Sequence, residues 1–189
     1  MTAHRQTDQK PRQFALHTMS TPVGVIQFAT DENDTLFALT FEEQSEYISR
    51  LIARHFGGTQ LVPMVGPGPV GDSLQCYFDG DLVALSGIRT ASAGTPFQRE
   101  VWAALARIPV GTTTSYGAIA ASIGRPRAVR AVGMANGANP IGVVVPCHRV
   151  IATNGTMTGY GGGIERKRWL LAHEGVAVPR TLALVPSST

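Results

Sequence analysis

The segment 146–150, Pro-Cys-His-Arg-Val, places a cysteine and a histidine side by side, directly after the apolar run 141–145. A cysteine thiolate is a strong nucleophile, and a nearby base or positive charge raises its population near neutral pH. Neighbouring residues of an extended segment point to opposite faces, so Cys147 and His148 cannot easily hydrogen-bond each other directly. A turn or a bridging water would have to carry a proton between them. Taken alone, such a pair is more often a core cysteine beside a histidine whose hydrogen bonds are satisfied.

The charged residues around this segment are distributed unevenly. Across 101–151 the chain carries five arginines and no aspartate or glutamate. Such a stretch would present a positive face to phosphates. An ordinary solvated helix face is the alternative, and the net charge of +3 is only mildly basic and does not choose between the two.

Three helices are predicted on the N-terminal side of the cysteine. The first starts at Thr95, which can act as its N-cap, with Pro96 at the first helical position and Gln98 completing a capping box. Two short helices follow at about 116–123 and 126–136, joined by a Gly-Arg-Pro turn. Such a pair is a candidate helix-turn-helix, although helical hairpins are common and the spacing alone is a weak signal.

The second of these short helices has an unusual composition. Ala128, Ala131 and Ala135 keep its surface small, and Arg130 is a long cation on it. Such a slim helix could lie close to DNA and enter a narrow groove. It could equally pack tightly against another helix, and composition alone does not choose.

The first part of the chain predicts a small α/β unit. The expected elements are strands at 14–17, 23–29, 36–41 and 82–88, and helices at 47–56 and 74–78. We expect this unit to cover 13–89 and a linker at 90–94 to separate it from a second unit at 95–177. The ends, 1–12 and 178–189, are expected to be a flexible segment and a loose tail.

The composition is that of a globular protein, with 43% hydrophobic and 15% charged residues among 189. No segment approaches the ~20 apolar residues of a membrane span, and the pattern of a secretory signal is missing. Cys76 and Cys147 are expected to be free thiols in a reduced, cytoplasmic protein, Cys76 as a packed small residue. No four-ligand Cys/His zinc pattern is visible. The glycine-rich segment 159–163 lacks the Gly-Lys-Ser/Thr of a P-loop, so we expect a loop that approaches a ligand closely.

Several ordered motifs together make the chain resemble a known family. They are Asn139-Pro140, the segment 146–150, Gly159-Tyr160, and the segment 169–175, Trp-Leu-Leu-Ala-His-Glu-Gly. This set closely resembles the O6-alkylguanine-DNA alkyltransferases, also called methylated-DNA-protein-cysteine methyltransferases. The similarity covers 95–176. It implies a mainly α C-terminal domain with a helix-turn-helix, preceded by an RNase H-like α/β domain with a small antiparallel sheet and helices.

The resemblance implies DNA repair by direct, irreversible and stoichiometric transfer of an alkyl group to Cys147. The donor would be O6-alkylguanine, and also O4-alkylthymine, flipped out of double-stranded DNA. His148 would act as the base through a water, and Glu174 would orient the histidine. Asn139 would organise the turn of the active site, and Tyr116 would donate a proton to the leaving base.

The resemblance also assigns residues to binding. It places Val150, Tyr160, Gly161 and Met134 at the substrate. It places Arg130, Tyr116, Arg127, Ala131 and Ala128 at the DNA, with Arg130 replacing the flipped nucleotide in the stack. It implies a monomer that needs no cofactor and no membrane. We expect no metal, since Cys76 is the only cysteine of the N-terminal part and the histidines there are scattered.

Two other functions compete with this interpretation. A non-catalytic protein that binds alkylated DNA would share the fold but lack the cysteine, and Cys147 is present. A cysteine hydrolase with a Cys-His-Glu triad would give the arginine-bearing helix no role, and no oxyanion-hole element is evident. Hydrolysis would show multiple turnovers, whereas alkyl transfer to the chain would stop after one.

Overall fold

The computed structural model describes residues 13–56, 60–157 and 159–177. Its N-terminal part is a four-stranded sheet in the order β3-β2-β1-β4. The strands are β1 (Gln13–Thr21), β2 (Gly24–Thr30), β3 (Leu36–Phe41) and β4 (Gln60–Pro63). The first three pair antiparallel, whereas β4 runs parallel to β1, so the sheet is mixed. The predicted fold class is confirmed, with this fourth strand added to the sheet.

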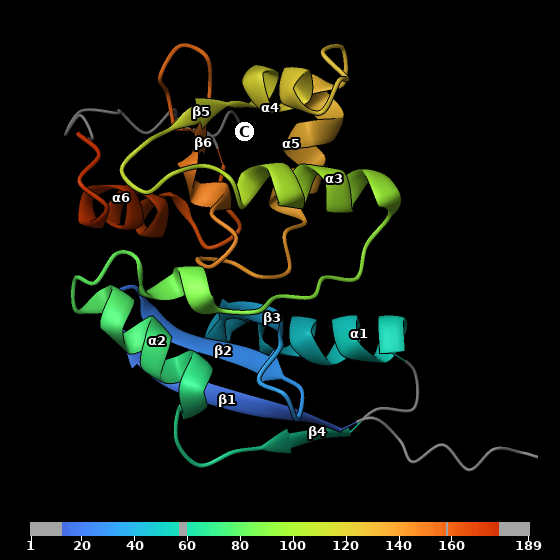
Figure 1. The fold of residues 1–189 in the computed structure, drawn as a ribbon, viewed down its shortest axis with the longest axis vertical. Helices are drawn as coiled ribbons and strands as arrows, with labels where there is room; N and C mark the ends of the chain where they lie inside the picture. The colour runs from blue at the N-terminus through green and yellow to red at the C-terminus, as the bar shows by residue number, and fades with distance from the viewer. Residues whose placement is uncertain (1–12, 57–59, 158, 178–189) are drawn as a thin grey trace, which may run out of the picture.

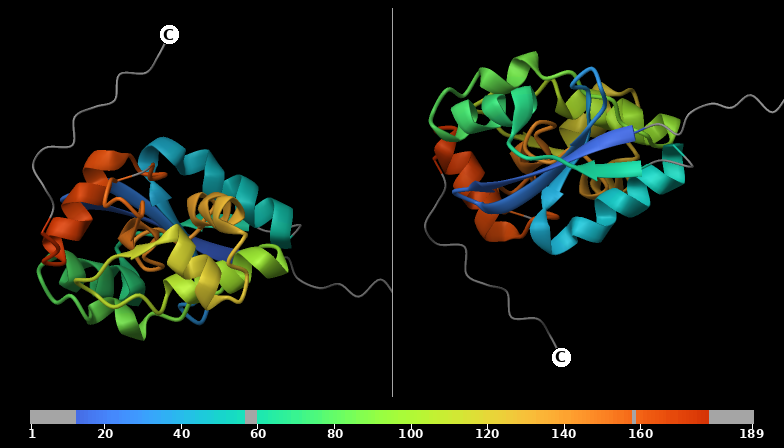
Figure 2. Two further views of the ribbon diagram at one scale, coloured as in Figure 1. Left: turned by 90° about the horizontal axis from the view of Figure 1, so that it is seen from above. Right: turned by 90° about the horizontal axis from the view of Figure 1, so that it is seen from below.

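Helices cover both faces of this sheet. They are α1 (Ser45–Phe56) and α2 (Gly68–Phe78), which lie on opposite sides of the strands (Figure 2). The alternation of the strands explains this, because Phe28 packs in the core under α2 whereas its neighbour Ala29 packs in the core under α1. Within the described ranges, no helix is both long and apolar enough to cross a lipid bilayer.

The strand predicted at 82–88 is wrong. This segment forms a turn and then the 3₁₀ helix Ala84–Gly87. Val83, directly before that helix, is 68% exposed. The chain returns to β3 only afterwards, where Leu36 N donates to Arg89 O at 2.9 Å. The alternating apolar residues of this segment pack against α2, not against a sheet edge, and the sequence pattern does not distinguish these two partners.

The C-terminal part is mainly helical and lies beyond the β3 edge of the sheet (Figure 1). Its helices are α3 (Pro96–Leu105), α4 (Tyr116–Ser122), α5 (Val129–Gly137) and α6 (Ile164–His173). A two-stranded parallel pair, β5 (Thr114–Ser115) and β6 (Val150–Ile151), joins α4 to the segment after the cysteine. The predicted capping box is present at the start of α3, where Thr95 Oγ1 accepts from Gln98 N at 3.2 Å.

The first residues of α4 and α5 are set by a capping hydrogen bond and by a turn, respectively. Ser115 caps α4 by accepting from Ala118 N at 3.1 Å. The α5 helix begins at Val129, three residues later than predicted, because Pro126 and Arg127 lie in the turn that precedes it. Both predicted short helices are thus present.

The two parts share one hydrophobic core. The strand β3 is hydrogen-bonded to the C-terminal part, because Leu39 N donates to Pro140 O at 2.8 Å and Gly142 N donates to Leu39 O at 3.1 Å. Phe28, Leu74, Leu105 and other residues of both parts belong to a single buried cluster. The segment that leads to the cysteine is therefore fixed against the sheet.

Candidate active site between the sheet and the helices

The turn that carries the cysteine is fixed by Asn139. Its Oδ1 accepts from Ile141 N at 3.1 Å, and its Nδ2 donates to Val145 O at 2.8 Å. Between these contacts Val143 has φ of 66°, in the left-handed region that a β-branched residue rarely adopts. The Asn139 amide therefore bridges a strained turn, and the 3₁₀ helix Cys147–Arg149 begins directly after it.

The Cys147 thiol is almost fully buried and lines a cavity of about 450 Å³. Burial raises the pKa of this thiol, while a hydrogen bond from Asn139 and the charge of Lys167 act in the opposite direction. Lys167 is itself buried, and its Nζ donates to Val150 O at 2.6 Å. Burial lowers the pKa of Lys167 to about 8, although the charge of Cys147 opposes this. At neutral pH a positive charge therefore still favours the thiolate.

Glu174 is the centre of the hydrogen bonds beside the cysteine. Its carboxylate accepts from His148 Nε2 at 3.0 Å, from Tyr77 Oη at 2.8 Å, and from Nε and Nη2 of Arg149 at 2.8 Å each. Burial alone would raise the pKa of Glu174, but the hydrogen bonds from His148 and Arg149 outweigh it and bring the pKa to about 2. The third donor of Arg149, Nη1, reaches Ile108 O at 2.6 Å. Glu174 is thus a buried carboxylate whose charge is compensated.

His148 is held as a neutral ring. It is fully buried, and burial lowers its pKa even though Glu174 acts in the opposite direction. Because the Glu174 carboxylate can only accept, we assign the ring proton to Nε2, which leaves a lone pair on Nδ1. This Nδ1 has no hydrogen-bond partner within the described ranges. Such a ring can accept a proton.

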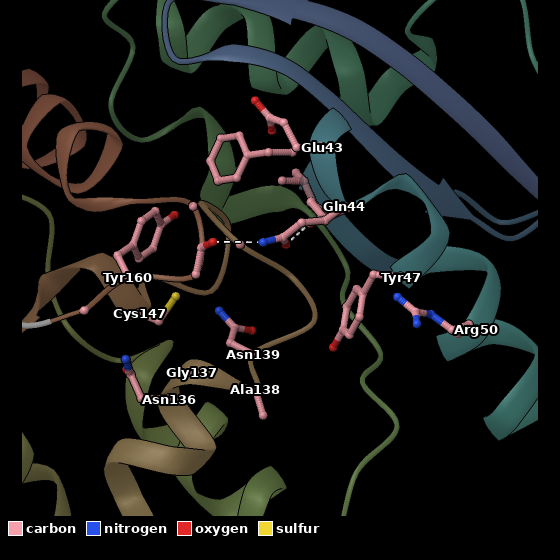
Figure 3. A pocket seen from close by; sticks show the side chains of 17 residues that line it. Glu43, Gln44, Tyr47, Arg50, Asn136, Gly137, Ala138, Asn139, Cys147 and Tyr160 are labelled. Carbon is pink, nitrogen blue, oxygen red and sulfur yellow. Dashed lines mark hydrogen bonds between the residues drawn. The ribbon is translucent and has the colours of Figure 1, made fainter. Parts of the chain in front are cut away.

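Both parts of the chain line the cavity (Figure 3). Its walls include Gln44 and Tyr47 from the sheet side, Asn136 and Asn139 at the end of α5, and Tyr160 and Gly161 from the glycine-rich loop. The loop is tied to the sheet side, because Gln44 Nε2 donates to Gly161 O at 2.9 Å. A cavity of this volume, with a nucleophile and a few polar groups in its wall, suits a small organic group such as a single base.

Comparison with known proteins identifies the chain. Residues 96–176 match the family model described as 6-O-methylguanine DNA methyltransferase, DNA binding domain. A methylated-DNA-protein-cysteine methyltransferase of Salmonella typhimurium is 50% identical over 83% of this chain and 93% of its own length. The crystal structure of Mycobacterium tuberculosis OGT in complex with DNA has a TM-score of 0.72 and 41% identity, and the match covers 85% of this chain and 93% of that one. The chain belongs to the methylated-DNA-protein-cysteine methyltransferase family.

A methylated-DNA-protein-cysteine methyltransferase repairs DNA by transferring an alkyl group to one of its own cysteines. The predicted family, activity and DNA-binding domain are confirmed. Two cysteines are present, and both are free. Cys76 is exposed on α2, so its prediction as a packed small residue is wrong, whereas Cys147 faces the cavity.

The structure brings together most of the residues that the methyltransferase resemblance assigned to chemistry and substrate. Cys147, Asn139, Tyr160 and Gly161 line the cavity, and His148 and Glu174 form the buried pair behind it. Three others are not in the cavity wall, and one of them is Tyr116, which begins α4. Met134 is 74% exposed and is absent from the cavity wall, and Val150 is fully buried behind it, with its carbonyl bound to Lys167.

The residues assigned to DNA lie on or next to α5. Arg127, Arg130 and Ala131 are exposed, and Ala128 and Tyr116 are half-buried. Tyr116 begins α4 and lies against Gly133, since a Cβ on that glycine would be 3.9 Å from the tyrosine ring. The small residues of α5 thus permit a close approach of the two helices.

Sequence reasoning missed several residues of this site. Among them are Asn136 in the cavity wall, Tyr77 and Arg149 at Glu174, and Lys167 beside the thiol. A signal existed for one of them, because Lys167 shares a helical face with Leu170, Leu171 and Glu174, a pattern that favours burial. Tyr77 reaches Glu174 across 97 positions of sequence, and no local pattern announces that contact. Among the residues that the structure describes, no group of three His, Cys, Asp or Glu could hold a metal ion.

Proposed function

We propose that Cys147 is the alkyl acceptor in repair of O6-alkylguanine in double-stranded DNA. The observation that carries this proposal is the position of its thiol, in a cavity of about 450 Å³ and beside a neutral histidine bound to a buried carboxylate. Cys76 has no comparable surroundings, because it is exposed on α2. The proposal extends to O4-alkylthymine, whose reacting oxygen has the same chemistry.

Activation of the thiol begins with proton removal. The free lone pair of His148 Nδ1 accepts the proton through a bridging water, and Glu174 stabilises the imidazolium that forms. Lys167 raises the thiolate fraction by its charge. Asn139 keeps the turn in place and hydrogen-bonds the sulfur, so the nucleophile is held at the cavity wall.

Transfer is then a single displacement. The Cys147 sulfur forms a bond to the alkyl carbon as the bond from that carbon to O6 breaks, and the electron pair of the broken bond goes to the base. Tyr116 gives a proton to a ring nitrogen of the leaving base. The proton that left the thiol then restores Tyr116, so the net result is one proton moved from the thiol to the base. No oxidation takes place and no cofactor is required. The thioether that forms is stable, so each chain acts once.

The exposed face of α5 supplies the DNA contacts. Arg127 and Arg130 provide positive charge toward phosphates, and Ala128 and Ala131 allow the helix to enter the minor groove closely. Arg130 takes the place of the flipped nucleotide in the base stack, which offsets the few kcal/mol that flipping costs. We place this reaction in the cytoplasm. We assign it to a monomer, because one chain carries the cavity, the nucleophile and the DNA-binding helix.

Intact-protein mass spectrometry tests this proposal. The protein is incubated with a duplex that contains one O6-methylguanine, and the mass and the modified residue are determined. We expect one added methyl group per chain, mapped to Cys147, which is lost in Cys147→Ser and retained in the matched control Cys76→Ser. Methyl transfer that persists in Cys147→Ser, or that occurs more than once per chain, would contradict the proposal.

A further inference from the structure

Asn136 is a buried polar residue in the cavity wall that the transfer mechanism does not use. It is 5% exposed and is the second-last residue of α5. Figure 3 shows its side chain close to Cys147, at the same wall of the cavity. Its Oδ1 is buried and has no hydrogen-bond donor among the residues that the structure describes.

The neighbouring Asn139 makes the contrast clear. Both ends of the Asn139 amide are engaged with the backbone of the turn, at Ile141 N and Val145 O. A buried acceptor without a donor, such as Asn136 Oδ1, is unfavourable for the folded state, and such atoms are rare in native proteins. Its presence beside the nucleophile indicates that the donor comes with the substrate.

The chemistry of the alkylated base limits which donor this is. Alkylation of O6 removes the hydrogen from ring nitrogen N1, so the exocyclic 2-amino group is the N–H donor that remains on O6-alkylguanine in DNA. Alkylation of thymine at O4 likewise removes the hydrogen from N3 and leaves a base without any N–H donor. An acceptor in the cavity wall can therefore distinguish these two substrates.

We propose that Asn136 Oδ1 accepts a hydrogen bond from the 2-amino group of the flipped base and thereby favours alkylated guanine over alkylated thymine. This inference rests on the proposed function, because it requires the base to occupy the cavity. A base without the amino group leaves the acceptor unpaired, and sites built around such a hydrogen bond reject substrates that lack the partner. We expect Asn136 to contribute about tenfold to this preference.

A substrate-and-protein double-mutant cycle tests the contact. Single-turnover transfer rates are measured on duplexes with O6-methylguanine or with O6-methylhypoxanthine, which lacks only the 2-amino group. The proteins are the wild type, Asn136→Leu, and Asn33→Leu as a matched control at an exposed turn. We expect loss of the amino group to slow the wild type and the control about tenfold more than it slows Asn136→Leu.

Stability separates this role from a structural one. Leucine has a similar volume and needs no donor, so the melting temperature of Asn136→Leu should be equal to or above that of the wild type. If leucine prevents folding, Asn136→Ala serves in the same cycle. Equal slowing of wild type and Asn136 variants by the missing amino group overturns the inference while leaving Cys147 as the acceptor. Absence of transfer by the wild type on both substrates overturns the proposed function itself.

Discussion

Replacing Arg149 by methionine should destabilise the protein mainly through the charge that it leaves behind. Arg149 makes two charge-assisted hydrogen bonds to the Glu174 carboxylate and a third to Ile108 O. The two side chains are 8% and 0% exposed, so water cannot replace the lost donors. Removal of one partner of a buried ion pair costs about 3–5 kcal/mol. Because whole domains are stable by only ~5–15 kcal/mol, we expect a large fall in the free energy of unfolding.

Urea unfolding of Arg149→Met at neutral pH measures this loss, and the chain offers a matched control. Arg125 also bonds a carboxylate, at 3.2 Å from Glu100, but these side chains are 53% and 43% exposed. Arg125→Met should therefore cost less than about 1 kcal/mol. In Arg149→Met the pKa of Glu174 should rise, so acidification should reduce the difference from the wild type once Glu174 is protonated. Equal losses in the two variants, or a loss independent of pH, would refute the argument from buried charge.

Three further outcomes follow from the same geometry. In the wild type, the pKa of Glu174 is lowered from 4.5 to about 2. Its contribution to stability is therefore present above pH 4.5, and about 3 kcal/mol of it is lost as the pH falls toward about 2. Urea unfolding across this interval should show a smaller decrease in Glu174→Gln. Lys167→Met should slow transfer about tenfold at neutral pH, but its rate should approach that of the wild type above pH about 8, where Lys167 loses its charge; a rate–pH profile decides this. Gln44→Ala frees the Gly161 carbonyl and should weaken binding of alkylated DNA severalfold with a stability loss of about 1 kcal/mol, measured by titration and by melting.

The local features of the chain were predictable from its sequence because local physics determines them. The capping box at Thr95 and the helices around Arg130 follow from side chains only a few positions apart. The apolar run before Cys147 placed the thiol in a buried segment. The strand β4 escaped prediction, since its four residues end in a proline and have little pattern of their own. Its position depends on pairing with β1, which lies far away in the sequence.

The environment of the nucleophile was less predictable, because distant segments supply it. Sequence reasoning left open a turn or a bridging water between Cys147 and His148, and the structure has a 3₁₀ turn there. That turn exists because the Asn139 amide is inserted between two backbone groups of a strained loop. The geometry of the adjacent pair therefore depends on a residue eight positions upstream of the cysteine.

Glu174 shows why the fold and the reactive site cannot be separated in this protein. Its hydrogen-bond donors come from α2 and from the 3₁₀ helix of the cysteine. One of these donors, Arg149, also binds the carbonyl of Ile108, which follows α3. Each of these donors compensates a charge that would otherwise oppose burial, and the same bonds fix the tautomer of His148. The Tyr77 donor comes from the sheet part and the other donors come from the helical part, so full compensation of the buried carboxylate requires both parts to be folded. His148 and Glu174 themselves lie in the helical part, and the packing of the two parts completes their hydrogen-bond network.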